Sequence, residues 1–272
     1  ASALDLTRRV LGYLPSSCYD LPVAHPPRDA EPIPRIPQDH REPYDVRTVI
    51  DGVVDGGSFL ELHEQFAPNV VVGFARVEGR PVGVVANQPL VLAGCLDIDA
   101  SEKAARFVRL CDAFGLPLVT LVDVPGFLPG TGQEASGIIR KGAKLLYAFA
   151  EATVPRVTVI LRKAFGGAYI VMNSKSLGAD AVFSWPGAEI AVMGAEGAID
   201  VIYRRELAAE PQRRAELLAN YRAEAMNPTV PAERLSVDEV IAPADTRSAV
   251  ASTLRSLERA LRPGYRHDNL PQ

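Results

Sequence analysis

From residue 44 onward, short apolar runs alternate along the chain with segments in which apolar residues have helical spacing. Short continuous runs of aliphatic and β-branched residues lie near residues 82, 118, 157 and 181, and each run is followed by a segment with helical spacing. Continuous apolar runs are typical of strands that are buried on both faces of a mainly parallel sheet. Strands that alternate with helices are typical of crossover connections. The pattern therefore predicts an α/β fold of stacked ββα turns.

Residues typical of helix caps and turns mark the ends of the predicted helices and strands. Two strands joined by a hairpin at residues 78–80 are predicted within residues 69–88, because Gly79 suits the turn. Further strands are predicted at residues 116–126, 156–163 and 180–186. A helix at 44–57 is expected to be capped by Gly57, and a helix at 99–115 to open at Asp99 or Ser101 and close at Gly115. Other helices are predicted at 134–152, from the glycines after residue 165 through Ser176, and at 194–207, 211–226 and 245–261.

Prolines divide the chain before residue 44. They stand at positions 15, 22, 26, 27, 32, 34, 37 and 43, which disfavours helix and favours extended chain. Residues 1–43 are therefore predicted to be a linker or a wrapping arm, and residues 44–272 a domain. Ile33 and Ile36 favour an ordered arm on a surface, and a flexible tether is the alternative.

Composition and charge narrow the function classes. The chain has 272 residues, of which 47% are hydrophobic and 23% charged, as in globular proteins. A net charge of −4 provides no basic surface, so no nucleic-acid partner is expected, although local patches could still bind acyl-CoA or phosphate. Three cysteines without metal-ligand spacing predict no disulfide scaffold and no metal site. Because long apolar stretches and a signal peptide are lacking, we expect a soluble, cytoplasmic protein.

Conventional catalytic motifs are missing from the sequence. The histidines are His25, His40, His63 and His267, and those in the arm and the C-terminal tail are expected to be solvated. "DVPG" at residues 123–126 resembles a nucleotide-switch motif, but no P-loop accompanies it. "GTGQEA" at residues 130–135 fits a dinucleotide fingerprint, yet "PGFLP" separates its glycines from the preceding strand. An ordered loop and a functional loop both remain open for this segment.

The glycine-rich segment "AFGGAYIVM" at residues 164–172 is the strongest candidate site. A strand that turns into a helix at glycines presents unpaired backbone N–H groups, which can hold developing negative charge without an ionisable side chain. Glycine also lets a ligand approach the backbone closely. "MGAEGA" at residues 193–198 repeats the layout with Gly194, Ala195, Glu196 and Gly197. The alternative for both segments is a tight helix–strand packing joint.

Three stretches resemble one known family. They are "NQPLVLAGCLDIDASEKAARFVRLCDAF", the stretch from "LVDVPGFLPGTGQEA" through "RKAFGGAYIVMNSK", and "WPGAEIAVMGAEGA". These stretches are similar to the carboxyltransferase β-subunit of biotin-dependent acyl-CoA carboxylases of the propionyl-CoA/acetyl-CoA type. The resemblance covers nearly everything from Tyr44 onward and corresponds to the C-terminal half of such subunits. It implies a ClpP/crotonase-like fold, with the acyl-CoA-binding N-terminal half absent from this chain.

The resemblance also implies a division of chemical roles. In the family, carboxybiotin releases CO₂, and the freed biotin nitrogen removes the α-proton of the acyl-CoA. The protein supplies an oxyanion hole for each reactant. Carried onto this sequence, the biotin-side donors are the N–H groups of Gly167 and Ala168, and Gly166 permits the turn. The expected active-site wall consists of Phe127, Leu128, Gly130, Thr131 and Gly132.

Cofactor and partners follow from the same resemblance. Biotin is expected on a separate carrier, with a biotin carboxylase subunit, an N-terminal carboxyltransferase half and a hexameric assembly as partners. Propionyl-CoA-preferring members often carry Asp after "GGAY", where this chain has Ile170, so acetyl-CoA or a broader range is expected. A helix-core isoleucine is the alternative. A biotin-dependent decarboxylase or transcarboxylase, and a non-catalytic docking module, remain alternative functions.

Overall fold

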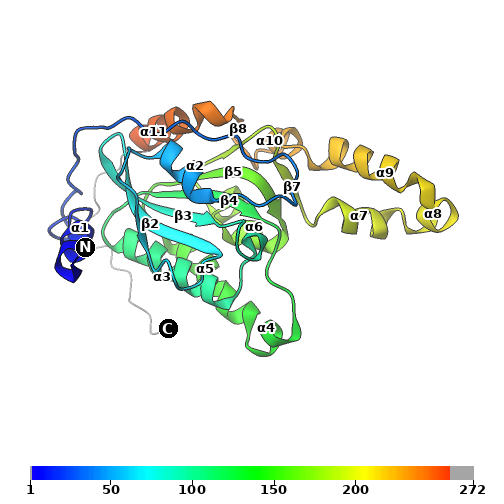
Figure 1. Ribbon diagram of the computed structural model, residues 1–272, viewed down its shortest axis with the longest axis horizontal. Coiled ribbons are helices and arrows are strands. Elements are labelled where there is room, and N and C mark those ends of the chain that lie inside the picture. The colour runs from blue at the N-terminus through cyan, green and yellow to red at the C-terminus, as the bar shows by residue number, and fades with distance from the viewer. Residues whose placement is uncertain (1, 258–272) are drawn as a thin grey trace.

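A central sheet organises the part of the chain that the computed structural model describes, residues 2–257 (Figure 1). Within these residues eight strands pair in the order β1-β2-β3-β4-β5-β6-β8, and β7 pairs with β5 beyond the end of β6. β1, β2 and β3 are antiparallel, and the pairs from β3 onward are parallel. The strands are β1 (Leu60–Leu62), β2 (Val70–Val77), β3 (Arg80–Asn87), β4 (Leu118–Val124), β5 (Arg156–Phe165), β6 (Ala181–Ser184), β7 (Glu189–Ala191) and β8 (Glu239–Val240).

Helices connect the strands and cover both faces of the sheet. The helices are α1 (Ala3–Leu11), α2 (Val46–Val53), α3 (Ile98–Ala113), α4 (Thr131–Ala135), α5 (Ile138–Glu151), α6 (Gly166–Val171), α7 (Ala195–Ile202), α8 (Arg204–Ala209), α9 (Arg214–Tyr221), α10 (Thr229–Glu233) and α11 (Thr246–Ser256). α3 and α5 pack on one face, and α2 and α11 pack on the other. The predicted α/β class with crossover connections is confirmed.

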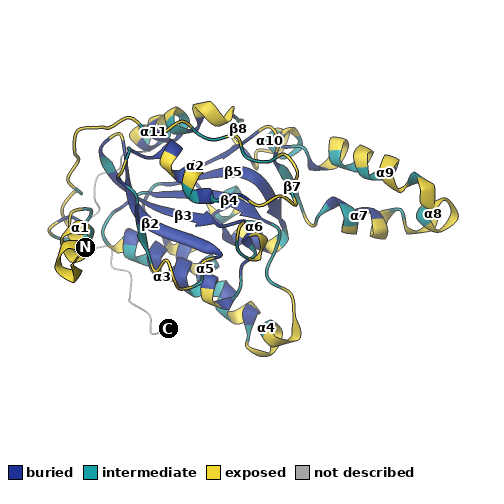
Figure 2. Ribbon diagram, in the orientation of Figure 1, coloured by how far each residue is buried: buried dark blue, intermediate teal, exposed yellow. Residues whose placement is uncertain are grey.

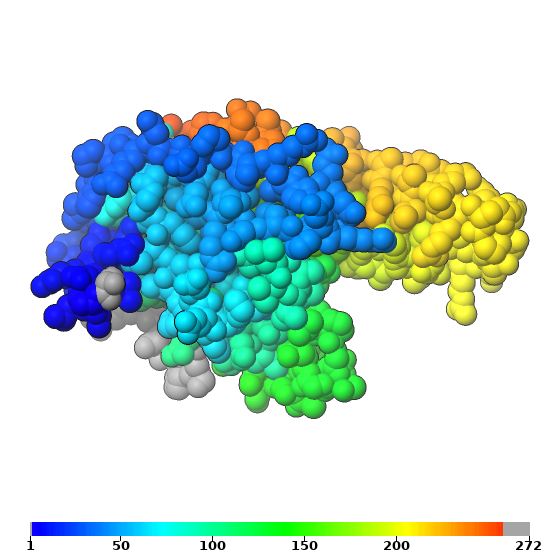
Figure 3. Space-filling view, in the orientation of Figure 1, coloured from blue at the N-terminus to red at the C-terminus, as the bar shows by residue number. Residues whose placement is uncertain are grey.

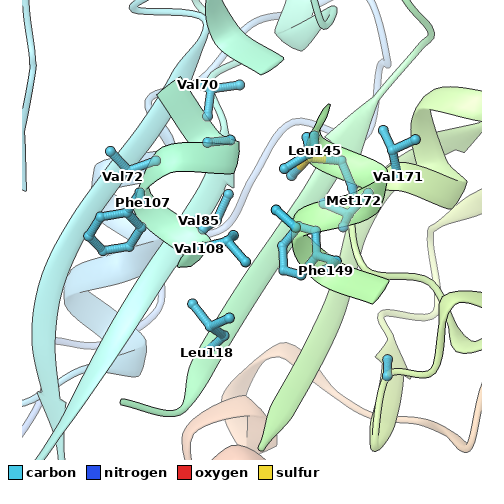
Figure 4. Close-up of a cluster of buried hydrophobic side chains, with 14 of the residues drawn as sticks. Val70, Val72, Val85, Phe107, Val108, Leu118, Leu145, Phe149, Val171 and Met172 are labelled. Carbon is cyan, nitrogen blue, oxygen red and sulfur yellow. The ribbon is translucent and has the colours of Figure 1, made fainter. Parts of the chain in front are cut away.

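Both faces of the sheet are buried, which explains the continuous apolar runs. Phe107 and Val108 of α3 belong to the same buried cluster as Leu145 and Phe149 of α5 (Figure 4). Along β4, alternate residues join different clusters: Leu118 packs with α3 and α5, whereas its neighbour Val119 packs with α2 and α11. Because side chains alternate between faces, a strand buried on both sides needs apolar residues at nearly every position.

The hairpin between β2 and β3 forms where it was predicted. Glu78 and Gly79 both have positive φ, 49° and 80°, as a tight two-residue hairpin turn requires. A Cβ atom on Gly79 would lie 1.8 Å from the carbonyl oxygen of His25, so only glycine fits beneath the arm.

Several predicted helix ends are wrong, in each case because of local capping. α3 begins at Ile98, since Asp97 rather than Asp99 or Ser101 caps it by accepting from the N–H of Ala100. α2 ends at Val53, and the expected cap Gly57 lies four residues beyond its last residue. Gly137, with φ 83°, divides the expected 134–152 helix into α4 and α5.

The remaining predicted helices are also interrupted. α6 ends at Val171, and a separate 3₁₀ turn, Lys175–Leu177, follows it. Tyr203 separates α7 from α8. The 211–226 segment contains a 3₁₀ turn, α9 and a π turn. α11 covers the start of the predicted 245–261 helix, whose residues from 258 onward lie outside the described residues.

Residues 13–43 run across the outside of the sheet layers (Figure 3). Ile33 packs against Gly52 of α2, where a Cβ would come within 2.5 Å of its side chain. Because proline lacks an N–H, an extended proline-rich segment has surplus carbonyl acceptors. Arginines supply the donors: Arg76 donates to the carbonyls of Gly12 and Val23, and Arg247 to that of Arg28. The segment is therefore held by core side chains, and its division from the domain at residue 43 stays a prediction.

An extension of three helices projects from the body. α7, α8 and α9 lie at the far end of Figure 1, and Figure 2 shows that much of their surface is exposed. Val201 and Ile202 of α7 are exposed apolar residues there. Among the described residues, no helix has both the length and the apolar character needed to cross a bilayer.

Candidate functional site

The glycine turn lies at the edge of the sheet where parallel strands end. Phe165 is the last residue of β5 and also the N-cap of α6. Gly166 has φ 59°, and a Cβ atom on it would come within 2.8 Å of the carbonyl oxygen of Val192. Positive φ and this close approach together require glycine. At Gly166 the structure therefore agrees with the alternative prediction, in which glycine is needed for tight packing between helix and strand.

Gly167, the next residue of the turn, is open to solvent, whereas Ala168 is buried. No side chain caps α6, and the N–H groups of the first turn of a helix lack intrahelical acceptors. Gly167 is exposed, and a Cβ on it would meet only the Cε2 atom of Phe127, at 4.0 Å. The methyl group of Ala168 points instead into the core and is buried. Packing therefore does not require glycine at position 167.

Two residues that follow in α6 differ in exposure. Ile170 is 42% exposed, so the alternative interpretation of a helix-core isoleucine is wrong. Tyr169 is mostly buried, and burial raises its pKa to about 12. Ile170 therefore faces solvent, whereas Tyr169 packs against the buried cluster that α3 and α5 share.

Only some residues of the predicted active-site wall lie near the glycine turn at the start of α6. The Phe127 ring packs against Gly142 of α5, where a Cβ would lie 2.9 Å from its Cε1 atom, and its other edge faces Gly167. Leu128 donates its N–H to the carbonyl of Leu96 at 2.7 Å, which fixes this strand-like segment. Gly130, Thr131 and Gly132 are exposed at the start of α4, which projects away from α6 in Figure 1.

The second glycine loop packs against the first. Gly194 caps α7, and a Cβ on it would lie 3.5 Å from the Phe165 ring. Ala195 is buried beside Phe165 and Met226. Glu196 forms ion pairs with Arg222 at 3.0 Å and with Arg41 at 3.6 Å. Gly197 is exposed within α7. Residues 194–196 thus support the end of β5.

A cavity of about 500 Å³ lies beside these two loops. Its lining comes from the arm, from β5 and β7, and from the helical extension: Gln38, Asp39, His40, Arg41, Lys163, Phe165, Glu189, Gly194, Glu196, Leu218 and Arg222. His40 was expected to be solvated, which is wrong: it is half-buried, with Nδ1 3.2 Å from Oε2 of Glu189. No local sequence signal could have paired these residues, because they are 149 positions apart and meet only through the path of the arm.

The charged groups around Glu189 lower the pKa of its carboxyl group. Burial raises the pKa of Glu189, but the hydrogen bond and the charge of His40 lower it. The charges of Arg222 and Lys163 also lower it, so the pKa of Glu189 lies below its ordinary value of 4.5. The carboxylate form of Glu189 is therefore favoured in the folded chain.

Replacing Glu189 by glutamine should lower the free energy of unfolding by about 1 kcal/mol at pH 7. Because folding lowers the pKa of Glu189, its stabilising effect is fully present above pH 4.5 and is lost as the pH falls through the folded value. Urea denaturation of the wild type and of Glu189→Gln at pH 7 and at about pH 3.5 measures the effect. An equal difference in stability at both pH values would contradict it.

Comparisons with known proteins show the family of this chain. The family model described as "Carboxyl transferase domain" matches residues 1–270. The propionyl-CoA carboxylase carboxyltransferase subunit of Haloferax mediterranei is 54% identical, over 99% of this chain and 54% of the relative. The methylmalonyl-CoA carboxyltransferase 12S subunit of Propionibacterium freudenreichii subsp. shermanii is 51% identical, over 98% of this chain and 53% of the relative.

Solved structures show the same fold. Transcarboxylase 12S, described as a hexamer with methylmalonyl-CoA bound, superimposes with a TM-score of 0.90 at 50% identity, over 98% of this chain and 53% of that one. The β subunit of geranyl-CoA carboxylase from P. aeruginosa gives a TM-score of 0.75 at 28% identity, over 93% and 49%. The predicted crotonase-like fold is confirmed, and the chain spans about half the length of the relatives it matches. On its sequence and its fold, the chain belongs to the carboxyl transferase domain family.

Proposed function

We propose that this chain is the biotin-side half of a carboxyltransferase, which transfers the carboxyl group of carboxybiotin to the α-carbon of acetyl-CoA or propionyl-CoA. One observation carries the proposal: α6 starts with an uncapped turn at which Gly167 leaves open space beside its backbone. Residues 44–272 would form the catalytic domain, and residues 1–43 the connection to an acyl-CoA-side half. Family membership supports the reaction class.

The glycine turn of α6 suits the ureido ring of biotin, which is neutral and gains negative charge on its oxygen when CO₂ leaves. When bound, carboxybiotin supplies CO₂ and a nitrogen base that takes the α-proton of the acyl-CoA. The N–H groups of Gly167 and Ala168 would donate to the ureido oxygen of bound biotin, and they are in place beforehand because α6 is already formed. Gly166 sets the direction of these donors. Phe127 excludes water from one side of Gly167.

Partners and location follow from the same proposal. Biotin would arrive on a separate carrier protein that a biotin carboxylase subunit loads, and a hexamer would bring the two halves together. The hexameric transcarboxylase 12S and a relative named as biotin-dependent, from Mycobacterium leprae, support this arrangement. Cys18, Cys95 and Cys111 are free thiols in the described part of the chain, in accord with a cytoplasmic location.

A transcarboxylase is the second candidate. This candidate is supported by the 12S relative, which is 51% identical to this chain and is named as a methylmalonyl-CoA carboxyltransferase subunit. Such an enzyme would run the same half-reaction with methylmalonyl-CoA as the carboxyl donor to biotin. A comparison of acetyl-CoA, propionyl-CoA and methylmalonyl-CoA as substrates separates the two candidates.

The test is a transfer assay in which this chain is combined with an acyl-CoA-binding half. We expect carboxylation of acetyl-CoA or propionyl-CoA that depends on carboxybiotin. The same mixture without carboxybiotin is the control. A folded complex that shows no transfer would contradict the proposal and would favour a docking module.

Ile170→Asp should shift substrate preference from acetyl-CoA toward propionyl-CoA. Ile170 is exposed at the outer face of α6, so a carboxylate there changes the surface that meets the acyl chain without opening a core cavity. We expect the ratio of kcat/KM values to change by about tenfold, which corresponds to about 1.4 kcal/mol. Ile139→Asp, at another exposed isoleucine on α5, is the matched control. An unchanged ratio would remove Ile170 from substrate selection.

A further inference from the structure

The aspartate of "DVPG" fills an irregularity between β4 and β5. The register runs from Val122 opposite Ile160 to Val124 opposite Ala164, so β5 has more residues than β4 at this point. The Asp123 carboxylate occupies the gap, where Oδ1 accepts from the backbone N–H of Lys163 at 3.2 Å. Asp123 is fully buried. The side chain therefore replaces the ladder bonds that the irregularity removes.

Arg162 joins this buried carboxylate to the arm. Its Nε donates to Oδ2 of Asp123 at 2.9 Å. Its Nη1 lies within hydrogen-bond distance of three arm carbonyls, those of Pro37, Asp39 and Glu42, at 3.4, 3.0 and 2.8 Å. Its guanidinium also lies over the ring of Tyr44, 5.0 Å from the ring centroid. One side chain thus holds both the end of β5 and the arm turn at residues 37–42.

Both ends of this connection border the proposed site. The arm turn carries residues 38–41, which form one wall of the cavity, and the Nζ of Lys163 reaches the His40 carbonyl at 3.4 Å. On the other side, β5 continues for only three residues from Arg162 before the turn at Gly166. If Arg162 moved, both the cavity wall at residues 38–41 and the N–H groups at the start of α6 would therefore be displaced.

We propose that Asp123 and Arg162 are positioning residues of the carboxyl-transfer site, which hold the α6 donors and the cavity wall at residues 38–41 in one fixed arrangement. This inference rests on the proposed function of the α6 turn. Stability alone is a poor explanation for the pair, because buried ion pairs are often no more stabilising than apolar residues of similar volume. The geometry they impose on two separate segments is what apolar side chains cannot supply.

The chain offers a matched control in Arg76. This buried arginine likewise donates to backbone carbonyls, those of Gly12, Val23 and Gly79. It lies beside the β2–β3 hairpin, where β3 begins, whereas the α6 turn follows the end of the parallel strand β5. Loss of Arg76 should free the arm near residues 12–25 and leave the site unchanged.

The experiment compares Asp123→Leu/Arg162→Met, Arg162→Lys and Arg76→Met with the wild type. Hydrogen exchange on this chain reports the hydrogen-bonded amides of Arg41 and Glu42 in the arm turn and of Met172, whose N–H donates to the Ala168 carbonyl of α6. Thermal unfolding reports stability. The double variant removes both charges of this pair, and Lys163, whose Nζ lies 3.6 Å from Oδ1 of Asp123, keeps the His40 carbonyl as an acceptor. We therefore expect it to fold, yet exchange at both segments should rise at least tenfold. Arg162→Lys keeps the charge but loses the fork of donors, so it should show an intermediate rise. Arg76→Met should raise exchange only near residues 12–25.

Kinetics of the chain combined with an acyl-CoA-binding half supply the second readout. We expect the double variant to lower kcat at least tenfold while the KM for acyl-CoA stays within twofold, and Arg76→Met to change neither. Unchanged exchange at Met172, or an equal loss of kcat in Arg76→Met, would overturn the positioning role. If the wild-type assembly shows no transfer, the proposed function fails, and the exchange results still decide whether the pair fixes the two segments.

Discussion

Gly167→Val should lower carboxyl transfer by 100-fold or more while the chain stays folded. The Gly167 backbone has ordinary φ, and a Cβ on it would meet only the Phe127 ring edge at 4.0 Å, so valine fits without strain. Its methyl groups would occupy the space beside the N–H groups of α6, where an oxygen must lie about 3 Å from its donors. Loss of one such donor typically costs about 3 kcal/mol of transition-state stabilisation.

Gly187→Val is the matched control for this variant. Gly187 is exposed in the turn between β6 and β7, and a Cβ on it would meet nothing within 4 Å. Both variants should unfold within a few degrees of the wild type, and only Gly167→Val should lose transfer in the assay with carboxybiotin and acyl-CoA. Near-normal turnover by folded Gly167→Val would remove the turn from the mechanism.

This chain alone should show no carboxylation of acetyl-CoA or propionyl-CoA, and addition of an acyl-CoA-binding half should restore it. An enolate and a biotin anion arise on different reactants, so each needs its own preorganised donors. In the proposed function the α6 turn supplies one such set, and the chain spans about half the length of its relatives. The measurement is transfer from carboxybiotin by the purified chain, with and without the added half.

Activity of the purified chain would contradict this division of roles. The thioester oxyanion site would then lie within these residues, and the start of α7 at Gly194 would be the first place to search. That loop is a weaker candidate, because Gly194 and Ala195 pack against Phe165. The Gly167→Val variant combined with the added half is the control for transfer that bypasses the α6 turn.

The sequence predicted those features that local chemistry determines. Apolar runs such as the one that forms β4 indicated strands buried on both faces, and Gly79 marked the hairpin turn, because burial and positive φ leave few residue choices. The strand-to-helix turn at Gly166 was predicted on the same grounds. Helix ends were less predictable, since several residues near each end can act as caps, as Asp97 did in place of Asp99.

Only the tertiary structure decided which residues meet at the sheet edge. His40 reaches Glu189, and Arg162 reaches the carbonyl of Asp39, across more than a hundred residues of sequence, through the path of an arm that prolines make extended without setting its direction. The resemblance assigned Phe127 to the site wall, but only the fold showed its ring between Gly142 of α5 and Gly167. The sequence by itself determined the glycine turn at residues 166–168, because that turn depends on backbone conformation. The cavity wall and the positioning pair required the fold, because long-range contacts leave no periodic signal in a single sequence.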